Sequence, residues 1–347
     1  MVIDTSLSVM MQLRGRGAVR PPIGIAFDGD LGNRVDALLA VAMLNGFAAK
    51  TEARRISLSV SQPSLTSAQL ADVVASFYRG RPVGGFGGGV GAISEGMIGM
   101  PEGSAPADDK PVLGATLSKK TAEGTPLYTS TISGLVNTAE SSVLIRNLLL
   151  AQHDGNAAIV LAGPATGLVR ILGLYRSGPQ VAAKCKHLVV AAGSFPAGQP
   201  EPSIRSDVPA ARKLFAEWPT PVVAVGAEVG EALPYPGSSI EKDFAWSPAH
   251  PVADAYRALE PMPYDAPASA LAAVLQAVHP DAGYFTLSEP GTISVLDDGR
   301  TRFTPGADGR HRYVIVDPAQ KERVLSLYTA MVSAPPAPRP GRRGGAE

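Results

Sequence analysis

Short apolar runs alternate with longer stretches of helical periodicity along most of the chain. The runs cover residues 24–28, 55–60, 157–163, 187–193 and 221–226. Strands of this length separated by helices are typical of a largely parallel sheet that is covered by helices on both faces. We therefore predict one α/β domain built on an open sheet.

The late part of the chain has a different pattern. After residue 285, polar and apolar residues alternate around the turn sequences 297–299 and 307–309. This alternation predicts hairpins, and thus a small β excursion late in the chain. A last stretch with helical periodicity, residues 319–332, predicts a helix that closes the domain.

Helical periodicity, glycines and missing periodicity give further predictions for residues 36–130. The Ala/Leu-rich sequence that starts at Asp36 has helical periodicity, and Gly46 is typical of the position just after a helix, so we expect the helix to end there. A second helix is predicted over 67–80.

Residues 81–130 show no clear period and predict an irregular middle. Their glycine-rich part, 84–91, lacks the Gly-Lys-Ser/Thr of a phosphate-binding loop and indicates a flexible loop.

The two ends differ in composition from the rest. We predict an N-terminal extension over 1–19, one domain over 20–333, and a disordered Pro/Gly/Arg-rich tail over 334–347 that cannot pack a core. In the extension, Arg14 and Arg16 follow the apolar residues, whereas a secretory signal places its positive charge first. We expect a cytoplasmic protein, with export after loss of an atypical leader as the alternative.

Composition excludes several classes of protein. Lys plus Arg and Asp plus Glu both number 31, so the formal net charge is zero and no basic footprint for a nucleic acid is expected. Cys185 is the only cysteine, which rules out a disulfide framework and a multi-thiolate metal site. The apolar stretches are far shorter than the ~18 residues of a membrane span. We expect a small-molecule partner, with neither nucleic acid nor membrane.

The loop after the first apolar run gathers carboxylates. Asp28 and Asp30 are two residues apart and face the same way in an extended chain, and Asp36 begins the following helix. In open α/β sheets, ligands bind beyond the carboxyl ends of the strands. Oxygen-rich clusters at such an end suit a hard cation such as Ca²⁺ or Mg²⁺. The alternative is that these aspartates only cap a helix and satisfy a turn.

Four ordered segments carry a resemblance to a known family. They are IAFDGDLGNRVDALLAVAML (25–44), LLLAQHDGNAAIVLAGPATGLVRIL (148–172), GSFPAGQPEPSIRSDVPAARKLF (193–215) and YDAPASALAAVLQAVHPD (264–281). Together they resemble the inosine–uridine-preferring nucleoside hydrolases. The resemblance implies a nucleoside-hydrolase-like fold, with a Rossmann-type, largely parallel open sheet flanked by helices.

The resemblance also implies an activity and a site. Family members use a Ca²⁺-activated water to cleave the N-glycosidic bond of ribonucleosides to base and ribose. By the same resemblance, Asp30 is the catalytic base and a homodimer or homotetramer is expected. The implied metal ligands are Asp28, Asp30, Asp36, the Thr166 carbonyl and Asp265, and the implied ribose ligands are Asp36, Glu201 and Ser203.

The chain departs from the family pattern at several of these positions. The aspartate pair that opens the first helix is Asp36-Ala37 here, so Ala37 stands where a metal ligand is expected unless the longer loop shifts Asp36 into that place. Ala270 stands at the late metal-binding aspartate, and Asp265 is the nearby substitute. Gly167 and Ser203 replace asparagines, and Ser269 or Tyr264 stands at the position of the histidine that protonates the leaving base.

These departures leave three functions open. The first is a working N-ribohydrolase with a rearranged calcium site. The second is a catalytically silent family member that keeps the fold and binds a nucleoside or a sugar. The third is a different hydrolase or binding role on the same fold, because the fold alone does not fix the function.

Overall fold

The computed structural model describes residues 21–79, 97–103, 109–196 and 198–336. The predicted extension 1–19 and the glycine-rich segment 84–91 lie outside the described residues, and the predicted tail is described only to residue 336. Within the described ranges, no helix combines the length and the apolar character needed to cross a bilayer.

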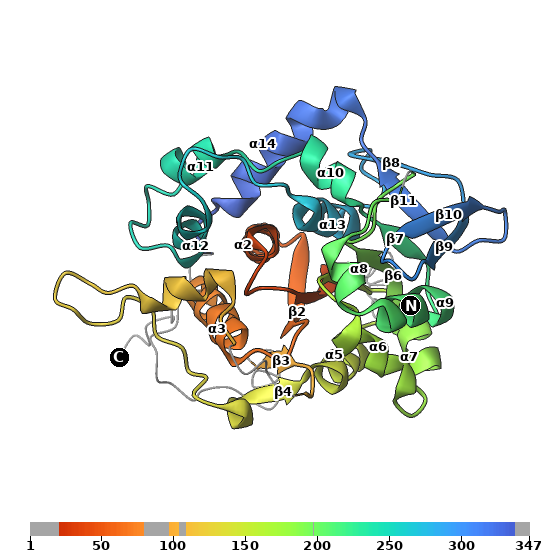
Figure 1. Cartoon of the computed structure of the whole chain (residues 1–347), viewed down its shortest axis with the longest axis horizontal. Coiled ribbons are helices and arrows are strands. Elements are labelled where there is room, and N and C mark those ends of the chain that lie inside the picture. Colours follow the sequence, from red (N-terminus) through yellow and green to blue (C-terminus); the bar gives the residue numbers. More distant parts are fainter. Residues whose placement is uncertain (1–20, 80–96, 104–108, 197, 337–347) are drawn as a thin grey trace, which may run out of the picture.

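The core of the fold is an 11-stranded sheet (Figure 1) with the order β10-β9-β11-β7-β6-β5-β1-β2-β3-β4, and β8 pairs with β11 beside this path. Neighbouring strands from β11 to β4 are parallel, whereas β8, β9 and β10 pair antiparallel. The strands are β1 (Ile23–Gly29), β2 (Ala53–Val60), β3 (Ile98–Met100), β4 (Thr138–Glu140), β5 (Ala157–Ala162), β6 (Cys185–Val190), β7 (Val222–Ala224), β8 (Thr286–Leu287), β9 (Gly291–Val295), β10 (Thr301–Pro305) and β11 (His311–Ile315).

Helices cover both faces of the sheet, and the predicted α/β fold is confirmed (Figure 1). The α-helices are α2 (Val35–Ala49), α3 (Leu65–Arg79), α5 (Ser141–Leu150), α6 (Thr166–Val169), α7 (Ser177–Lys184), α8 (Pro202–Ser206), α9 (Val208–Glu217), α10 (Ala227–Ala232), α11 (Gly237–Lys242), α12 (Pro251–Leu259), α13 (Ser269–Val278) and α14 (Lys321–Val332). Short 3₁₀ turns occupy Val112–Ser118, Leu135–Asn137, Arg170–Gly173 and Pro318–Gln320.

Two predictions about strands were wrong. Residues 81–130 were expected to be irregular, yet they contain β3, which pairs with β2 and β4. The turn 297–299 does connect a hairpin, β9–β10, but the turn 307–309 does not. The strand that follows it, β11, pairs in parallel with β7 and only at one position with β9. Pairing with β7 extends the main sheet and buries Val314 of β11 in the core.

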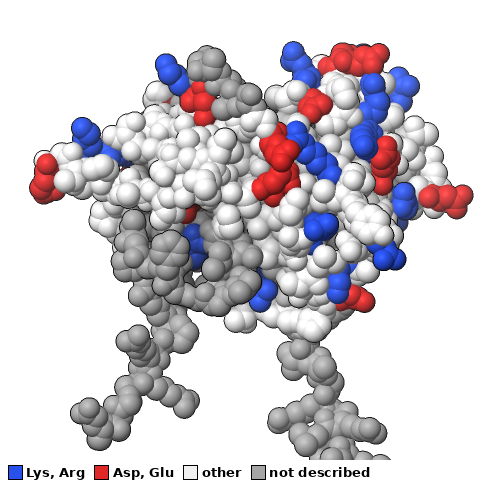
Figure 2. All heavy atoms as spheres, turned by 90° about the horizontal axis from the view of Figure 1, so that it is seen from below, with Lys and Arg blue, Asp and Glu red and all other residues white. Residues whose placement is uncertain are grey.

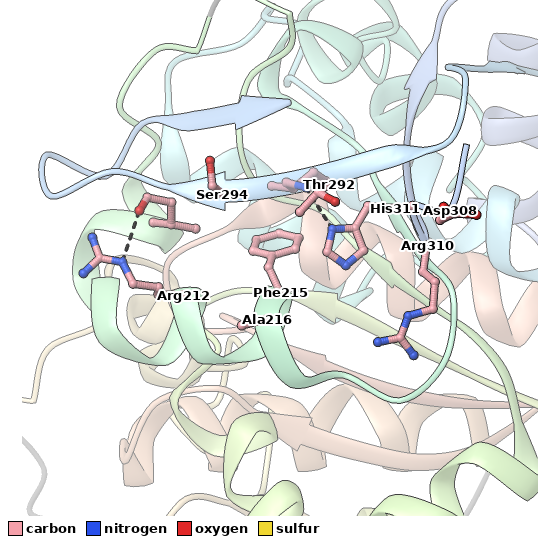
Figure 3. Close-up of a pocket in the computed structure, with 11 residues that line it drawn as sticks. Arg212, Phe215, Ala216, Thr292, Ser294, Asp308, Arg310 and His311 are labelled. Atoms are coloured by element: carbon pink, nitrogen blue, oxygen red, sulfur yellow. Dashed lines mark hydrogen bonds between the residues drawn. The ribbon is translucent and has the colours of Figure 1, made fainter. Parts of the chain in front are cut away.

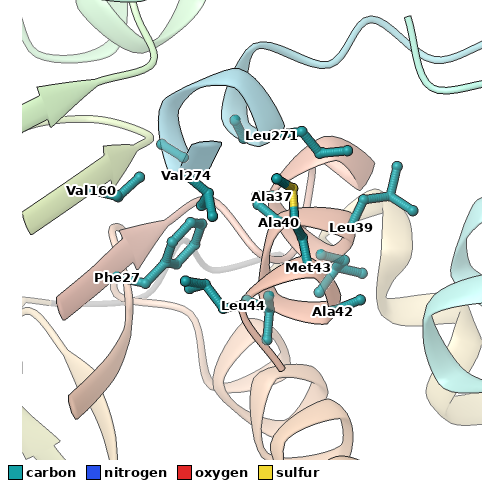
Figure 4. Close-up of a cluster of buried hydrophobic side chains, with 14 of the residues drawn as sticks. Phe27, Ala37, Leu39, Ala40, Ala42, Met43, Leu44, Val160, Leu271 and Val274 are labelled. Carbon is teal, nitrogen blue, oxygen red and sulfur yellow. The ribbon is translucent and has the colours of Figure 1, made fainter. Parts of the chain in front are cut away.

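The two hydrophobic cores lie on opposite faces of the sheet, because alternate side chains of a strand point to opposite sides. Phe27 of β1 belongs to the core beneath α2, α3, α12, α13 and α14, whereas Ala26 belongs to the core beneath α5, α6, α7 and α9. Figure 4 shows Phe27 and Val160 of the sheet facing Leu271 and Val274 of α13, with Met43 of α2 beside them. A helix that is apolar on all sides, like α2, is typical of a buried position.

Gly46 does not end its helix, contrary to the prediction. It lies buried inside α2, which continues to Ala49. At this point α2 passes the C-terminal end of α14, and a Cβ at Gly46 would overlap the Met331 carbonyl group, with the carbonyl carbon only 2.9 Å away. The glycine is therefore needed for the close approach of two helices rather than for a turn.

Substitution of Gly46 tests this packing. We expect Gly46→Ala to lower the free energy of unfolding by about 1–3 kcal/mol, the usual cost of overpacking, although alanine is the better helix former. Gly178→Ala in α7 is the matched control, because no atom lies within 4 Å of its Cβ position and the change should be neutral or stabilise by up to about 1 kcal/mol. The measurement is urea denaturation, and equal stability of both variants would contradict the described contact.

Candidate functional site

The chain changes direction across the sheet between β1 and β5. From β1 it runs through β2, β3 and β4 on one side, and then crosses to β5 on the other side of β1. Open α/β sheets bind ligands beyond the carboxyl ends of the strands at such a point, and we call this edge of the sheet the crevice. Asp28 lies at the end of β1, Asp30 lies in the loop after it, Asp36 lies at the start of α2, and Thr166 begins α6 after β5.

Asp28 is fully buried at the end of β1. Neither of its carboxylate oxygens has a hydrogen-bond partner among the described residues. Burial, reinforced by the charge of Glu140, raises the pKa of Asp28 to about 7. An unpaired carboxyl group in such a place keeps its proton far above its ordinary range, because the charged form is poorly solvated.

Gly167 explains the isolation of Asp28. It stands where the family pattern has an asparagine, and a Cβ at this position would lie 3.6 Å from Asp28 Oδ2 and 3.0 Å from Ser141 Oγ. An asparagine there would point its amide toward the carboxylate. Ser59, which pairs with Asp28 in the sheet register, and Ser141 also keep buried hydroxyls without a partner in the described chain. The pocket beside Asp28 is thus polar and incompletely hydrogen-bonded.

Asp30 lies just beyond β1 and is partly exposed. Its Oδ1 accepts a hydrogen bond of 2.9 Å from the Asn33 side chain. Burial raises the pKa of Asp30, while the bond from Asn33 and the charge of Arg34 act in the opposite direction. A carboxylate with a raised pKa that still reaches solvent has the properties of a general base.

Arg34 connects the parts of the crevice. Its guanidinium bonds both oxygens of Asp36, from Nε at 3.1 Å and from Nη2 at 2.8 Å. Nη2 also donates to Ser269 Oγ at 2.9 Å. Nη1 donates to Ser203 Oγ at 3.2 Å and to the Ala191 carbonyl at 3.3 Å. Burial alone would lower the pKa of Arg34, but Asp36 and the nearby Glu201 and Asp30 raise it, so the group stays charged.

Asp36 is buried, and besides its ion pair with Arg34 it accepts hydrogen bonds from the start of α13. Its Oδ2 accepts the backbone N–H of Ala270 at 2.9 Å and the Ser269 hydroxyl at 3.3 Å. These groups form the first turn of α13, whose own N-cap, Ala268, offers no side-chain bond. A carboxylate at a helix N-terminus satisfies free N–H groups and interacts favourably with the helix dipole. Asp36 therefore caps α13 from another helix.

Three predicted residues come from the loops after β5 and β6. Ser203 reaches Arg34 directly, and Glu201 interacts with its charge. Glu201 is buried and also caps α8, with Oε2 accepting the Ile204 N–H at 3.0 Å. The hydroxyl of Thr166 donates to Asp207 Oδ2 at 2.7 Å. The structure thus brings Asp30, Asp36, Glu201 and Ser203 around the Arg34 guanidinium.

The remaining predicted residue, Asp265, lies elsewhere. It is exposed, and its Oδ1 accepts the Gly237 N–H of α11 at 2.9 Å. The two alanines at expected metal positions are fully buried: Ala37 packs in the core between α2 and α13 (Figure 4), and Ala270 offers only its backbone N–H to Asp36. No carboxylate replaces either of them in the described part of the crevice.

Arg34 was not among the predicted site residues. One feature of the sequence could have indicated it. Arg34 is a basic residue two positions before Asp36, in an acidic loop that is longer than the corresponding loop of the family. Because loop arginines usually extend into solvent, the signal is weak by itself.

The donor set does not fit the calcium ion that the resemblance implies. Ca²⁺ prefers about six to eight oxygens, several of them charged. In the described residues no group of three or more His, Cys, Asp and Glu side chains could hold a metal. Both oxygens of Asp36 are bound to a guanidinium, Asp265 lies apart, and Ala37 and Ala270 supply no ligand.

A separate hollow lies at the other end of the sheet (Figure 3). It has a volume of about 480 Å³, between α9 and the segment from β9 to β11. Arg212 and Arg310 lie at opposite ends, with Phe215 and His311 between them. His311 Nδ1 accepts the Ile293 N–H at 2.9 Å, and burial lowers the pKa of His311, so the ring is a neutral part of the wall. No residue of the predicted site lines this hollow.

The surface in Figure 2 carries both signs of charge. On this face most of the Lys, Arg, Asp and Glu side chains lie over one half, where the two signs are interspersed, and the other half is largely uncharged. The described residues form no large patch of a single sign on this face.

Solved structures share this fold, although the sequence matches no protein-family model and no curated protein. An inosine-guanosine nucleoside hydrolase superposes with a TM-score of 0.67 at 14% identity, over 89% of this chain and 98% of that one. A purine-preferring ribonucleoside hydrolase from Gardnerella vaginalis gives 0.63 at 17% identity, over 89% and 98%. The type III effector XopQ, complexed with adenosine diphosphate ribose, gives 0.60 at 14% identity, over 96% and 99%.

At these identities the likeness establishes the fold. The chain has the nucleoside hydrolase fold, as its four ordered segments predicted. The likeness extends over most of each compared chain.

The isolated Asp28 predicts an unusual dependence of stability on pH. Its pKa is about 7 in the folded state against 3.8 ordinarily, so between these values the folded protein holds a proton that the unfolded chain releases. The free energy of unfolding should therefore fall as the pH rises through this range, by up to about 1.4 kcal/mol per pH unit from this group. Asp28→Asn should remove that fall and be more stable than the wild type at pH 8.

Urea denaturation from pH 5 to pH 8 measures this effect. Asp265→Asn is the control, because the same chemical change at an exposed carboxylate should leave the slope against pH unaltered. Equal slopes for Asp28→Asn and the wild type would show that Asp28 is ionised in the folded protein.

Proposed function

We propose that this protein binds the ribosyl part of a nucleoside or nucleotide in the crevice beyond β1 and β5, without the calcium ion of the family it resembles. The observation that carries the proposal is the network of Arg34, which gathers Asp36, Ser203 and Ser269 from three separate elements at a ligand-binding edge of the sheet.

The chemistry of the crevice suits a polyhydroxyl group. Carboxylate oxygens accept hydrogen bonds from sugar hydroxyls, and bonds to charged acceptors are stronger than bonds between neutral groups. Asp30 reaches solvent, and both Asp30 and Glu201 lie within the electrostatic field of the Arg34 guanidinium. These two carboxylates are the expected partners of the ribose hydroxyls.

The compared structures support the same class of ligand. Two are named as hydrolases of nucleosides, and a third was solved with adenosine diphosphate ribose. All of these ligands share a ribosyl group. We therefore choose ribose, inosine and ADP-ribose as probes for this chain.

The set of side chains in the crevice argues against calcium-dependent hydrolysis. A metal ion lowers the pKa of its bound water and orients the water and the sugar. The crevice of this chain has no matching ligand set, and the position of the family's general acid is occupied by Ser269, which bonds Arg34 and Asp36, or by Tyr264. Binding without turnover is the function that this geometry supports best.

Calorimetry with the three probes tests the binding. We expect a dissociation constant for at least one probe within about 1 µM–1 mM, the range usual for small-molecule sites. Asp30→Asn and Glu201→Gln should each weaken binding roughly 10- to 100-fold, because each removes a charged hydrogen-bond acceptor. Binding should be the same with EDTA and with added calcium.

Asp265→Asn is again the matched control and should bind like the wild type, because its carboxylate lies outside the crevice. The proposal fails if no probe binds at millimolar concentration, or if Asp30→Asn and Glu201→Gln bind as well as the wild type does.

Hydrolysis by Asp30 without a metal is the second candidate function. It is favoured by one observation, the raised pKa of a partly exposed carboxylate at the centre of the crevice. A general base in position contributes about 10²- to 10⁴-fold to a rate. Water would lose a proton to Asp30 and form a bond to the anomeric carbon of the sugar while the N-glycosidic bond breaks. The base would leave with the electron pair of that bond and take up a proton from solvent.

Release of free base from inosine and uridine distinguishes the candidates. Metal-free hydrolysis predicts turnover that persists in EDTA, increases as the pH rises through the pKa of Asp30, and falls about 10²-fold or more in Asp30→Asn. Turnover that depends on calcium would instead support the enzyme that the resemblance implies. Absence of turnover in both conditions would favour binding alone.

A further inference from the structure

The guanidinium of Arg34 uses all of its donors. An arginine side chain carries five N–H groups in a fixed fork. Here they reach both oxygens of Asp36, the hydroxyls of Ser203 and Ser269, and the Ala191 carbonyl, at distances of 2.8–3.3 Å. The side chain is only 22% exposed. A charged group is tolerated in such a place only when its hydrogen bonds with water are replaced in full.

The partners of Arg34 arrive from separate parts of the fold. Ala191 follows β6, Ser203 lies in α8, Ser269 begins α13, and Asp36 lies in the first turn of α2. Arg34 itself is the residue before α2, and its side chain does not cap the N–H groups of that helix. The side chain therefore serves the crevice and not the local helix end.

The position coincides with the one expected for an ion. Asp36 was the carboxylate expected to bind calcium or ribose, and Ser203 was expected to bind ribose. Both are hydrogen-bonded to one guanidinium. A divalent cation bound to Asp36 would lie beside this positive charge and be repelled by it. The guanidinium and a metal ion therefore exclude each other at this point.

The charges around Arg34 explain why a positive charge is stabilising at this position. Asp30, Asp36 and Glu201 all interact electrostatically with the guanidinium. Without a positive charge, three carboxylates would lie near one another in a partly buried crevice, and like charges in such a place are strongly unfavourable. One positive charge at the centre, hydrogen-bonded to Asp36, reduces this repulsion.

We propose that the Arg34 guanidinium is a built-in cation that takes the place of a bound metal ion in this crevice, so that the carboxylates are held ready for a ligand without any metal. This inference deepens the proposed function and rests on the crevice being the ligand site. It makes Arg34 a positioning residue, which acts on the ligand through Asp36, Ser203 and the neighbouring carboxylates.

Replacement of Arg34 by a neutral residue should make the stability of the protein depend on a bound metal ion. In Arg34→Ala the carboxylates lose their cation and the space of the guanidinium becomes available to an ion. We expect a melting temperature below that of the wild type in EDTA, and an increase of about 5 °C when calcium is present at about 100 times its dissociation constant. The wild type should show no such increase relative to sodium chloride of equal ionic strength.

Three further variants complete the experiment. Arg34→Gln removes the charge but keeps a polar side chain, so it should also gain a calcium response and serves if Arg34→Ala does not fold. Arg34→Lys keeps the charge without the fork, so it should be less stable than the wild type and unresponsive to calcium. Asp36→Asn in the Arg34→Gln background should lose the gained response, which locates the ion.

The outcomes separate this inference from the proposed function. A wild type stabilised by calcium through Asp36 would overturn the inference, and so would neutral variants that fold and ignore calcium. Failure of ribose, inosine and ADP-ribose to bind, with a calcium response that appears only in the neutral variants, would overturn the proposed function and leave the built-in cation standing.

Discussion

The pairing of Arg34 with Asp36 is the interaction on which the geometry of the crevice depends. Asp36 caps α13 with the same carboxylate oxygen that accepts from Arg34, and Arg34 reaches on to α8 and to the end of β6. One ion pair thus sets the spacing of α2, α8 and α13. Such a pair is stable only when every buried polar group is satisfied, and here all donors of the guanidinium have an acceptor.

Asp28 at the end of β1 and Asp36 at the start of α2 are both buried, but the cost of burying the carboxylate is offset differently in the two residues. Asp36 is compensated by a guanidinium and a helix N-terminus, whereas Asp28 has no partner in the described chain and holds a proton instead. The difference follows from single residues: Arg34 is present beside one, and Gly167 leaves the other without the side chain that could reach it.

Much of the sheet could be predicted, because β1, β2, β5, β6 and β7 overlap apolar runs of five to seven residues. The three-residue strands β3 and β4 are too short to show a period. The end of α2 was misjudged since the need for Gly46 arises from Met331, a contact distant in sequence. Of the site residues that the resemblance implies, Asp30, Asp36, Glu201 and Ser203 lie around Arg34, and their role stays a prediction. The resemblance could not identify Arg34, whose partners meet only in the folded chain.

The separation of those partners along the chain has a consequence for folding. The bonds of Arg34 to Ala191, Ser203 and Ser269 span 157, 169 and 235 residues. Closing chain segments of this length costs conformational entropy. The Arg34 network is therefore complete only when α2, β6, α8 and α13 have all come together, so it links distant parts of one domain.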